Sequence, residues 1–163
     1  MAQIDDRFFN VDRHGSLRPP GVLWLSLAFL ARHLILAAIV FASAKRSPEV
    51  VRLLGQSFSW MVLPLEIPVV LLMFAGANRA PGSGRWLRKI WHNGRMIVMG
   101  TVAMHLAWVG WMLSVSDVWR TWPELFLASC SLLDIAIAYG LLKDHYYRQL
   151  FADFPAPAAA AQT

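Results

Sequence analysis

Cysteine and charge are both scarce in this chain, and each scarcity excludes a class of protein. Cys130 is the one cysteine among 163 residues, so the chain has no internal disulfide, no CxxC redox motif and no cysteine-based zinc site. Quinone-coupled thiol oxidases need cysteine pairs and are excluded for the same reason. Charged residues make up 15% of the chain, against about 25% in ordinary globular proteins. The composition therefore predicts a membrane protein.

A cleavable signal peptide is also missing from the pattern. Residues 1–20 are polar, with a turn predicted from Asp12 to Gly15, and the first apolar run covers residues 21–43. That run begins late and is longer than the apolar part of a signal peptide, which has about 7–15 residues. We therefore expect it to remain in the protein as a first membrane helix.

What the chain does have is four long apolar stretches, in a sequence that is 57% hydrophobic. About 20 helical residues cross the hydrocarbon core of a bilayer, which is about 30 Å thick. The stretches predict an all-α polytopic membrane protein, a four-helix transmembrane bundle over residues 21–143. The expected parts are a cytoplasmic N-terminal arm at 1–20, helices at about 21–43, 57–77, 94–115 and 123–142, and a cytoplasmic, partly disordered tail at 144–163.

The net charge of +5 is explained by an asymmetry between the two sides of the membrane, so no nucleic-acid partner is expected. With four crossings, the two termini and the middle loop share one side, which carries ten of the 15 Lys and Arg residues. Positively charged loops stay in the cytoplasm. We therefore predict a protein of the bacterial inner membrane with both termini cytoplasmic.

Two surfaces are predicted to contact other molecules. Residues 78–93 combine helix-breaking Pro and Gly with basic and Trp side chains, a pattern typical of contact with the lipid bilayer surface. The residues expected to contact lipid headgroups are Arg85, Trp86, Arg88, Lys89 and Trp91. A stripe of small residues on the third helix allows close approach of a second copy or of another membrane protein. Its members are Ala103, Ala107, Gly110 and Ser114.

Ionisable residues lie near the centre of each apolar stretch: Arg32, His33, Glu66, His105 and Asp134. A charge at this depth costs about 2.5–3.5 kcal/mol on insertion scales, so such residues face inward and pair. Arg32 and Glu66 lie on consecutive helices, which are expected to be antiparallel neighbours. We therefore predict an Arg32–Glu66 ion pair and a second, proton-adjustable pair between Asp134 and His105.

Three functions remain open for this layer, of which an enzyme or electron carrier has the least support from the residues. The favoured interpretation is a non-enzymatic structural or accessory membrane component, in which the ion-pair network fixes the register of the helices. The alternative is a proton- or ion-coupled translocator or channel subunit that uses Glu66, Asp134 and His105. No catalytic residue, metal site or cofactor is predicted. A haem held by His33 and His105 is disfavoured because Arg32 and two carboxylates crowd the same region.

Ser129, Cys130 and Ser131 lie close to Asp134 in sequence and raise the question of a nucleophile. No base with an orienting partner is readable around them, so they are interpreted as helix-packing residues.

The arm DRHGSLRPP at residues 12–20 is followed by an apolar helix that contains LARH at residues 30–33. Together they resemble a family of small bacterial inner-membrane proteins known only by a domain-of-unknown-function label. The resemblance covers nearly the whole chain as a four-helix unit. It implies the fold and the location, assigns no activity or catalytic residue, and leaves the function open.

Overall fold

The computed structural model describes residues 11–12, 14–43, 62–115 and 122–155. Within these ranges the fold is all-α, as predicted, and the extended backbone forms one isolated antiparallel bridge, between Val11 and Leu17. The described helices are α1 (Gly21–Leu30), α2 (Arg32–Ser43), α4 (Leu63–Ala77), α5 (Arg85–His92), α6 (Gly94–Val115), α7 (Trp122–Lys143) and α8 (His145–Ala152).

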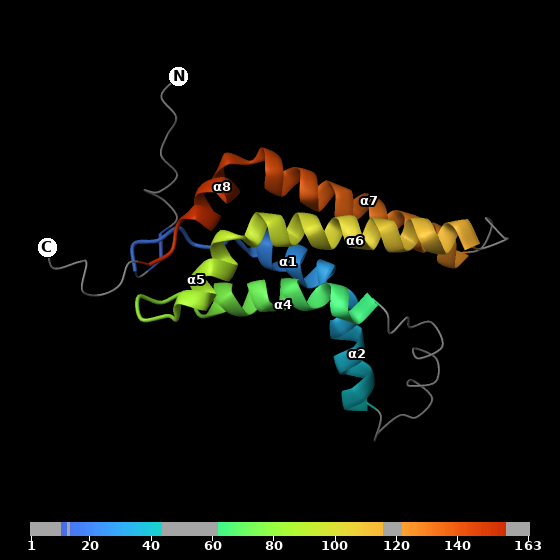
Figure 1. Cartoon of the computed structure of the whole chain (residues 1–163), viewed down its shortest axis with the longest axis horizontal. Helices are drawn as coiled ribbons and strands as arrows, with labels where there is room; N and C mark the ends of the chain where they lie inside the picture. The colour runs from blue at the N-terminus through green and yellow to red at the C-terminus, as the bar shows by residue number, and fades with distance from the viewer. Residues whose placement is uncertain (1–10, 13, 44–61, 116–121, 156–163) are drawn as a thin grey trace, which may run out of the picture.

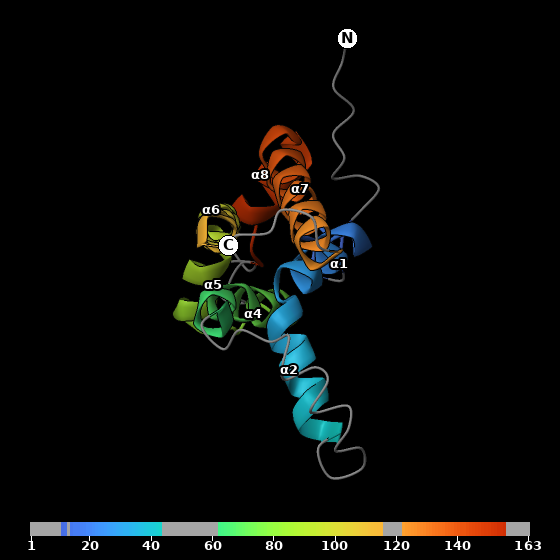
Figure 2. The same ribbon diagram turned by 90° about the vertical axis from the view of Figure 1, so that its right-hand side faces the viewer.

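Four helices, α1, α4, α6 and α7, run alongside one another along the long axis of the molecule (Figure 1). The short helices α5 and α8 cover one end of this group, next to the described part of the N-terminal arm. Helix α2 leaves the group sideways, and Figure 2 shows it extending away from the other helices. The buried core is therefore formed by α1, α4, α6 and α7, together with side chains from α5 and α8.

The apolar run at 21–43 is broken, and the prediction of one continuous helix there is wrong. Helices α1 and α2 meet at Ala31 with a bend of 73°, and Ala31 has φ −96° and ψ 19°. At the break, the backbone N–H groups of His33 and Leu34 donate to the Glu66 carboxylate instead of continuing the helix. A helix start leaves such N–H groups without intrahelical acceptors, and a carboxylate beside it is favourable. Glu66 thus stabilises the bend.

Two described helices, Gly94–Val115 and Leu125–Lys143, are long and apolar enough to cross a membrane. The broken pair α1–α2 would be a third span if its two parts count as one. The predicted extent of α6 agrees with the structure, and that of α7 differs by one residue at each end. Helix α4 is an apolar helix of 15 residues that includes Glu66, and the start of its expected range, residues 57–61, lies outside the described residues.

The end of the molecule that carries α5 and α8 is a packed cap, which we define as the described arm, the segment 78–93 and residues 144–155. Trp91 is fully buried, with its ring centroid 5.0 Å from that of Phe151. Its indole N–H donates to the carbonyl of Leu150 at 2.9 Å. The prediction that Trp91 contacts lipid headgroups is therefore wrong, because α8 covers it. Helix α8 lies within residues 144–163, for which the sequence predicts a partly disordered tail.

Two glycines allow the close approach that the cap requires. A Cβ atom added to Gly94 would lie 2.4 Å from the Phe151 ring, and one added to Gly76 would lie 2.8 Å from the Trp91 ring. The turn predicted in the arm is confirmed, because Gly15 has φ +74° and the Asp12 carboxylate accepts the N–H of His14 at 2.7 Å. Leu17, which follows this turn, is fully buried and donates its N–H to the Asp153 carboxylate at 2.7 Å.

Candidate functional site

The five ionisable residues near the centres of the apolar stretches meet in one place, which we call the polar cluster: Arg32, His33, Glu66, His105 and Asp134. Measured from the capped end, α1 reaches the break after ten residues. His105 is eleven residues into α6, and Asp134 is nine residues from the capped end of α7. These lengths correspond to about 14–17 Å, half the thickness of a hydrocarbon core.

Arg32 pairs with Asp134, and the predicted Arg32–Glu66 ion pair is wrong. The guanidinium donates to both carboxylate oxygens of Asp134, at 2.9 and 3.2 Å, and one of its nitrogens also donates to the carbonyl of Phe29. The bend at Ala31 explains the difference, since it points the first turn of α2 at Glu66 and leaves Arg32 facing α7. Asp134 is fully buried, so this two-point contact compensates a charge that water cannot reach.

Glu66 is fully buried and is held by the start of α2. One carboxylate oxygen, Oε1, lies 2.5 Å from Nδ1 of His33 and accepts the His33 backbone N–H at 3.3 Å. The other, Oε2, accepts the Leu34 N–H at 2.9 Å. A helix start attracts anions through its free N–H groups and its dipole. Here the anion is a side chain of the same protein, supplied by α4.

His105 lies between the two carboxylates. Its Nε2 is 3.4 Å from Oε1 of Glu66, and its Nδ1 is 3.4 Å from Oδ2 of Asp134. The predicted contact with Asp134 is therefore present but is shared with Glu66. The ring is 2% exposed, and neither nitrogen makes a hydrogen bond of normal geometry within the described residues. His105 links the Arg32–Asp134 pair to the Glu66–His33 pair.

The arrangement disfavours haem for a geometric reason. The centroids of the His33 and His105 rings are 5.9 Å apart, and Oε1 of Glu66 contacts both rings. The carboxylate thus fills the space that a porphyrin would need between two axial imidazoles.

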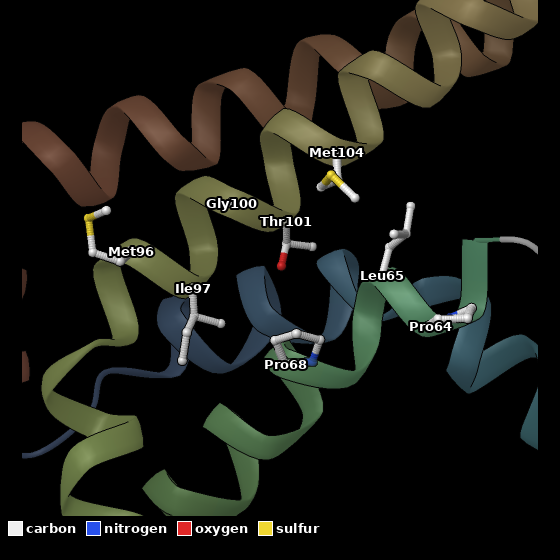
Figure 3. Close-up of a pocket in the computed structure, with 8 residues that line it drawn as sticks. All are labelled: Pro64, Leu65, Pro68, Met96, Ile97, Gly100, Thr101 and Met104. Atoms are coloured by element: carbon white, nitrogen blue, oxygen red, sulfur yellow. The ribbon is translucent and has the colours of Figure 1, made fainter.

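An apolar groove of about 510 Å³ runs between α4 and α6 (Figure 3). In this view α1 and α2 lie behind the two helices, and the side chains of Leu65, Pro68 and Thr101 extend into the gap. Glu66 follows Leu65 on α4, and His105 lies one turn beyond Thr101 on α6. The groove therefore follows the same turns that carry the polar cluster, and its lining is mainly apolar.

The other residues singled out from the sequence lie apart from the cluster. Arg85, Trp86 and Lys89 are exposed on α5, whereas Arg88 donates to the Pro155 carbonyl at 3.3 Å and lies over the Phe154 ring. The small-residue stripe of α6 is exposed along its length. The hydroxyls of Ser129 and Ser131 donate to carbonyls one turn earlier in α7, which agrees with their interpretation as packing residues.

Sequence reasoning missed Arg79, which holds the cap together. Its guanidinium donates to the carbonyls of Leu17 and Asp153, at 2.8 and 3.0 Å, and lies 4.7 Å from the centre of the Trp91 ring. A signal was available in the aromatic and apolar residues of 145–154, which are too many for a solvated tail.

Residues 7–153 match a protein family described as "Protein of unknown function (DUF2919)". No curated protein and no solved structure matches the chain.

Proposed function

The chain belongs to the DUF2919 family, and from that premise we propose that it is a non-enzymatic structural or accessory component of the bacterial inner membrane. The polar cluster acts in it as a clamp. The observation that carries this proposal is the two-point contact between Arg32 of α2 and the buried Asp134 of α7. Together with the capping of α2 by Glu66, it fixes a broken helix against α4, α6 and α7. Buried ion pairs are best attested in this role of specifying one arrangement.

The proposed topology has four crossings, with both termini in the cytoplasm. Helices α1 and α4 both extend from the capped end to the depth of the cluster. If the chain between α2 and α4 reaches the far face, each helix is half of a complete crossing. If it does not, α1, α2 and α4 form a re-entrant unit and only α6 and α7 cross. The apolar run that begins at residue 58, ahead of α4, favours the first arrangement.

Thiol labelling distinguishes the two arrangements. In a Cys130→Ala background, we expect Ser47→Cys to react in intact cells with a thiol reagent that cannot cross the inner membrane. The matched control, Ser83→Cys in the turn before α5, should react only after the cells are broken. A reporter fused after Thr163 should be active in its cytoplasmic form. If Ser47→Cys does not react with the reagent in intact cells, the four crossings are contradicted. If the reporter after Thr163 is active in a periplasmic form, the orientation is contradicted.

A second candidate function is a proton relay, and the position of His105 favours it. The polar cluster forms a continuous row of contacts, in the order Arg32, Asp134, His105, Glu66 and His33. His105 is 3.4 Å from an oxygen of each carboxylate. Imidazole and carboxylate groups at bilayer depth are the usual material of proton paths. The clamp is preferred because the Arg32 and Glu66 contacts also account for the bend.

Proton flux separates the clamp from the relay. With purified protein in liposomes that contain a pH-sensitive dye, we expect proton entry under an imposed potential to stay at the rate of protein-free vesicles. Asp134→Asn should not change that rate. If proton flux is several-fold above the protein-free rate and is lost in the Asp134→Asn protein, the clamp proposal is wrong and the relay is supported.

A further inference from the structure

We propose that His33, Glu66 and His105 form a binding site for a divalent transition-metal ion of the zinc or iron(II) class. One ligand atom from each residue lies within 4.8 Å of the other two, and the residues come from α2, α4 and α6. Zinc bonds of about 2.0–2.1 Å place tetrahedral ligand atoms about 3.3 Å apart. Nε2 of His105 is 3.4 Å from Oε1 of Glu66, close to this spacing. Nδ1 of His33 is 2.5 Å from the same oxygen, so the His33 ring would have to move outward to admit the ion.

The state of His105 is an independent argument for a ligand. Its ring is 2% exposed, and both ring nitrogens are without a normal hydrogen bond in the described part of the chain. A buried polar group without a hydrogen bond is unfavourable unless a partner or a ligand satisfies it. A metal ion between the three ligand atoms would satisfy Nε2.

The surroundings of His105 match those of a metal-bound histidine. Such a histidine donates its second ring N–H to a carboxylate, which fixes the orientation of the ring. Nδ1 of His105 faces Asp134 at 3.4 Å, and Arg32 in turn holds Asp134 at two points. The Arg32–Asp134 pair thus orients the proposed ligand without touching the ion.

Charge and ligand type indicate the class of ion. The cluster contains one fixed positive charge, Arg32, and two carboxylates, Glu66 and Asp134, so a cation relieves its excess of negative charge. Two imidazoles and one carboxylate suit zinc and iron(II), whereas calcium and magnesium prefer oxygen ligands. Three protein ligands leave a coordination position open, as in catalytic rather than structural zinc sites.

The ligands are far apart in the sequence and follow no short spacing motif, which explains why the sequence predicted no metal. The inference concerns the same cluster as the proposed clamp but does not depend on it. The Glu66–His33–His105 group could bind an ion whether or not Arg32 and Asp134 contribute to stability.

Metal titration of the purified, chelator-stripped protein in detergent tests the proposal. We expect one equivalent of Zn²⁺ per chain in competition with a chromophoric chelator. Co²⁺ in its place should give the visible absorption bands of a four-coordinate ion. His105→Gln and His33→Gln should each weaken Zn²⁺ binding more than about 100-fold, and Asp134→Asn by about 10–100-fold. The matched control, His145→Gln on the surface of α8, should bind as the unmodified protein does.

Circular dichroism checks the fold of each variant, and His33→Gln decides the question if His105→Gln does not fold. The proposal is overturned if the protein binds no stoichiometric Zn²⁺, or if His33→Gln binds it unchanged. The clamp is tested separately, from the stability of the stripped protein, so failure of one proposal is distinguishable from failure of the other.

Discussion

Replacing Arg32 by Met is expected to lower the free energy of unfolding by about 3–5 kcal/mol, because it leaves the buried Asp134 carboxylate without the guanidinium. The double variant Arg32→Met/Asp134→Leu removes both charges and should recover much of the loss. The measurement is denaturant unfolding in detergent, arranged as a double-mutant cycle. A coupling energy of about 1–3 kcal/mol is expected for two residues in direct contact.

A second cycle, with Arg32→Met and Glu66→Gln, is the control. Glu66 is bound by the start of α2 rather than by Arg32, so its coupling to Arg32 should be the smaller of the two. If the 32/66 cycle gives the larger coupling, the assignment of partners is wrong. If the losses of unfolding free energy in the 32/134 cycle are additive, the two side chains are not coupled and the proposed clamp is wrong.

Replacing Arg79 by Met should cost about 2–4 kcal/mol and should loosen the cap. Arg79 is 8% exposed, and its loss removes the guanidinium donor from the carbonyl of the buried Leu17. It also removes one of the two donors to the Asp153 carbonyl, which keeps the Trp91 indole N–H. It also removes a cation from the face of the Trp91 ring. Burial lowers the pKa of the Arg79 guanidinium, and nearby Asp12 and Asp153 oppose this shift. The group remains charged because arginine is the most basic of the side chains.

Thermal unfolding followed by circular dichroism measures this effect. Arg85→Met is the matched control, since Arg85 is exposed on α5 and its replacement should stay within about 0.5 kcal/mol. Equal stabilities of the two variants would mean that Arg79 does not hold the cap.

The sequence predicted that the five ionisable residues share one layer and that His105 contacts Asp134, but it did not predict the partner of Arg32. Depth follows from counting residues along apolar stretches, and the five ionisable residues share a layer by that count alone. The pairing depends on the direction of α2, which follows from the break at Ala31. No proline or glycine marks that break within LARH, residues 30–33. It depends on a carboxylate 33 residues further along the chain than His33, and local reasoning cannot detect such a partner.

The cap was missed for a related reason. Trp91 follows basic residues in an amphipathic segment, a pattern that favours the membrane surface when the segment is considered alone. Its burial requires Phe151 and the carbonyls of α8, which come from the other end of the chain. The extent of α6 was predicted correctly because it depends only on a continuous apolar run.

The contact between Arg32 and Asp134 also implies an order of events during biosynthesis. In the proposed membrane topology, translation delivers α1, α2 and α4 first, and Asp134 is made about 100 residues after Arg32. Until then Arg32 faces an insertion cost of about 2.5–3.5 kcal/mol without its carboxylate. The Glu66 contacts, by contrast, form within the first half of the nascent chain. Helix α7 is therefore the element that supplies the carboxylate partner of Arg32.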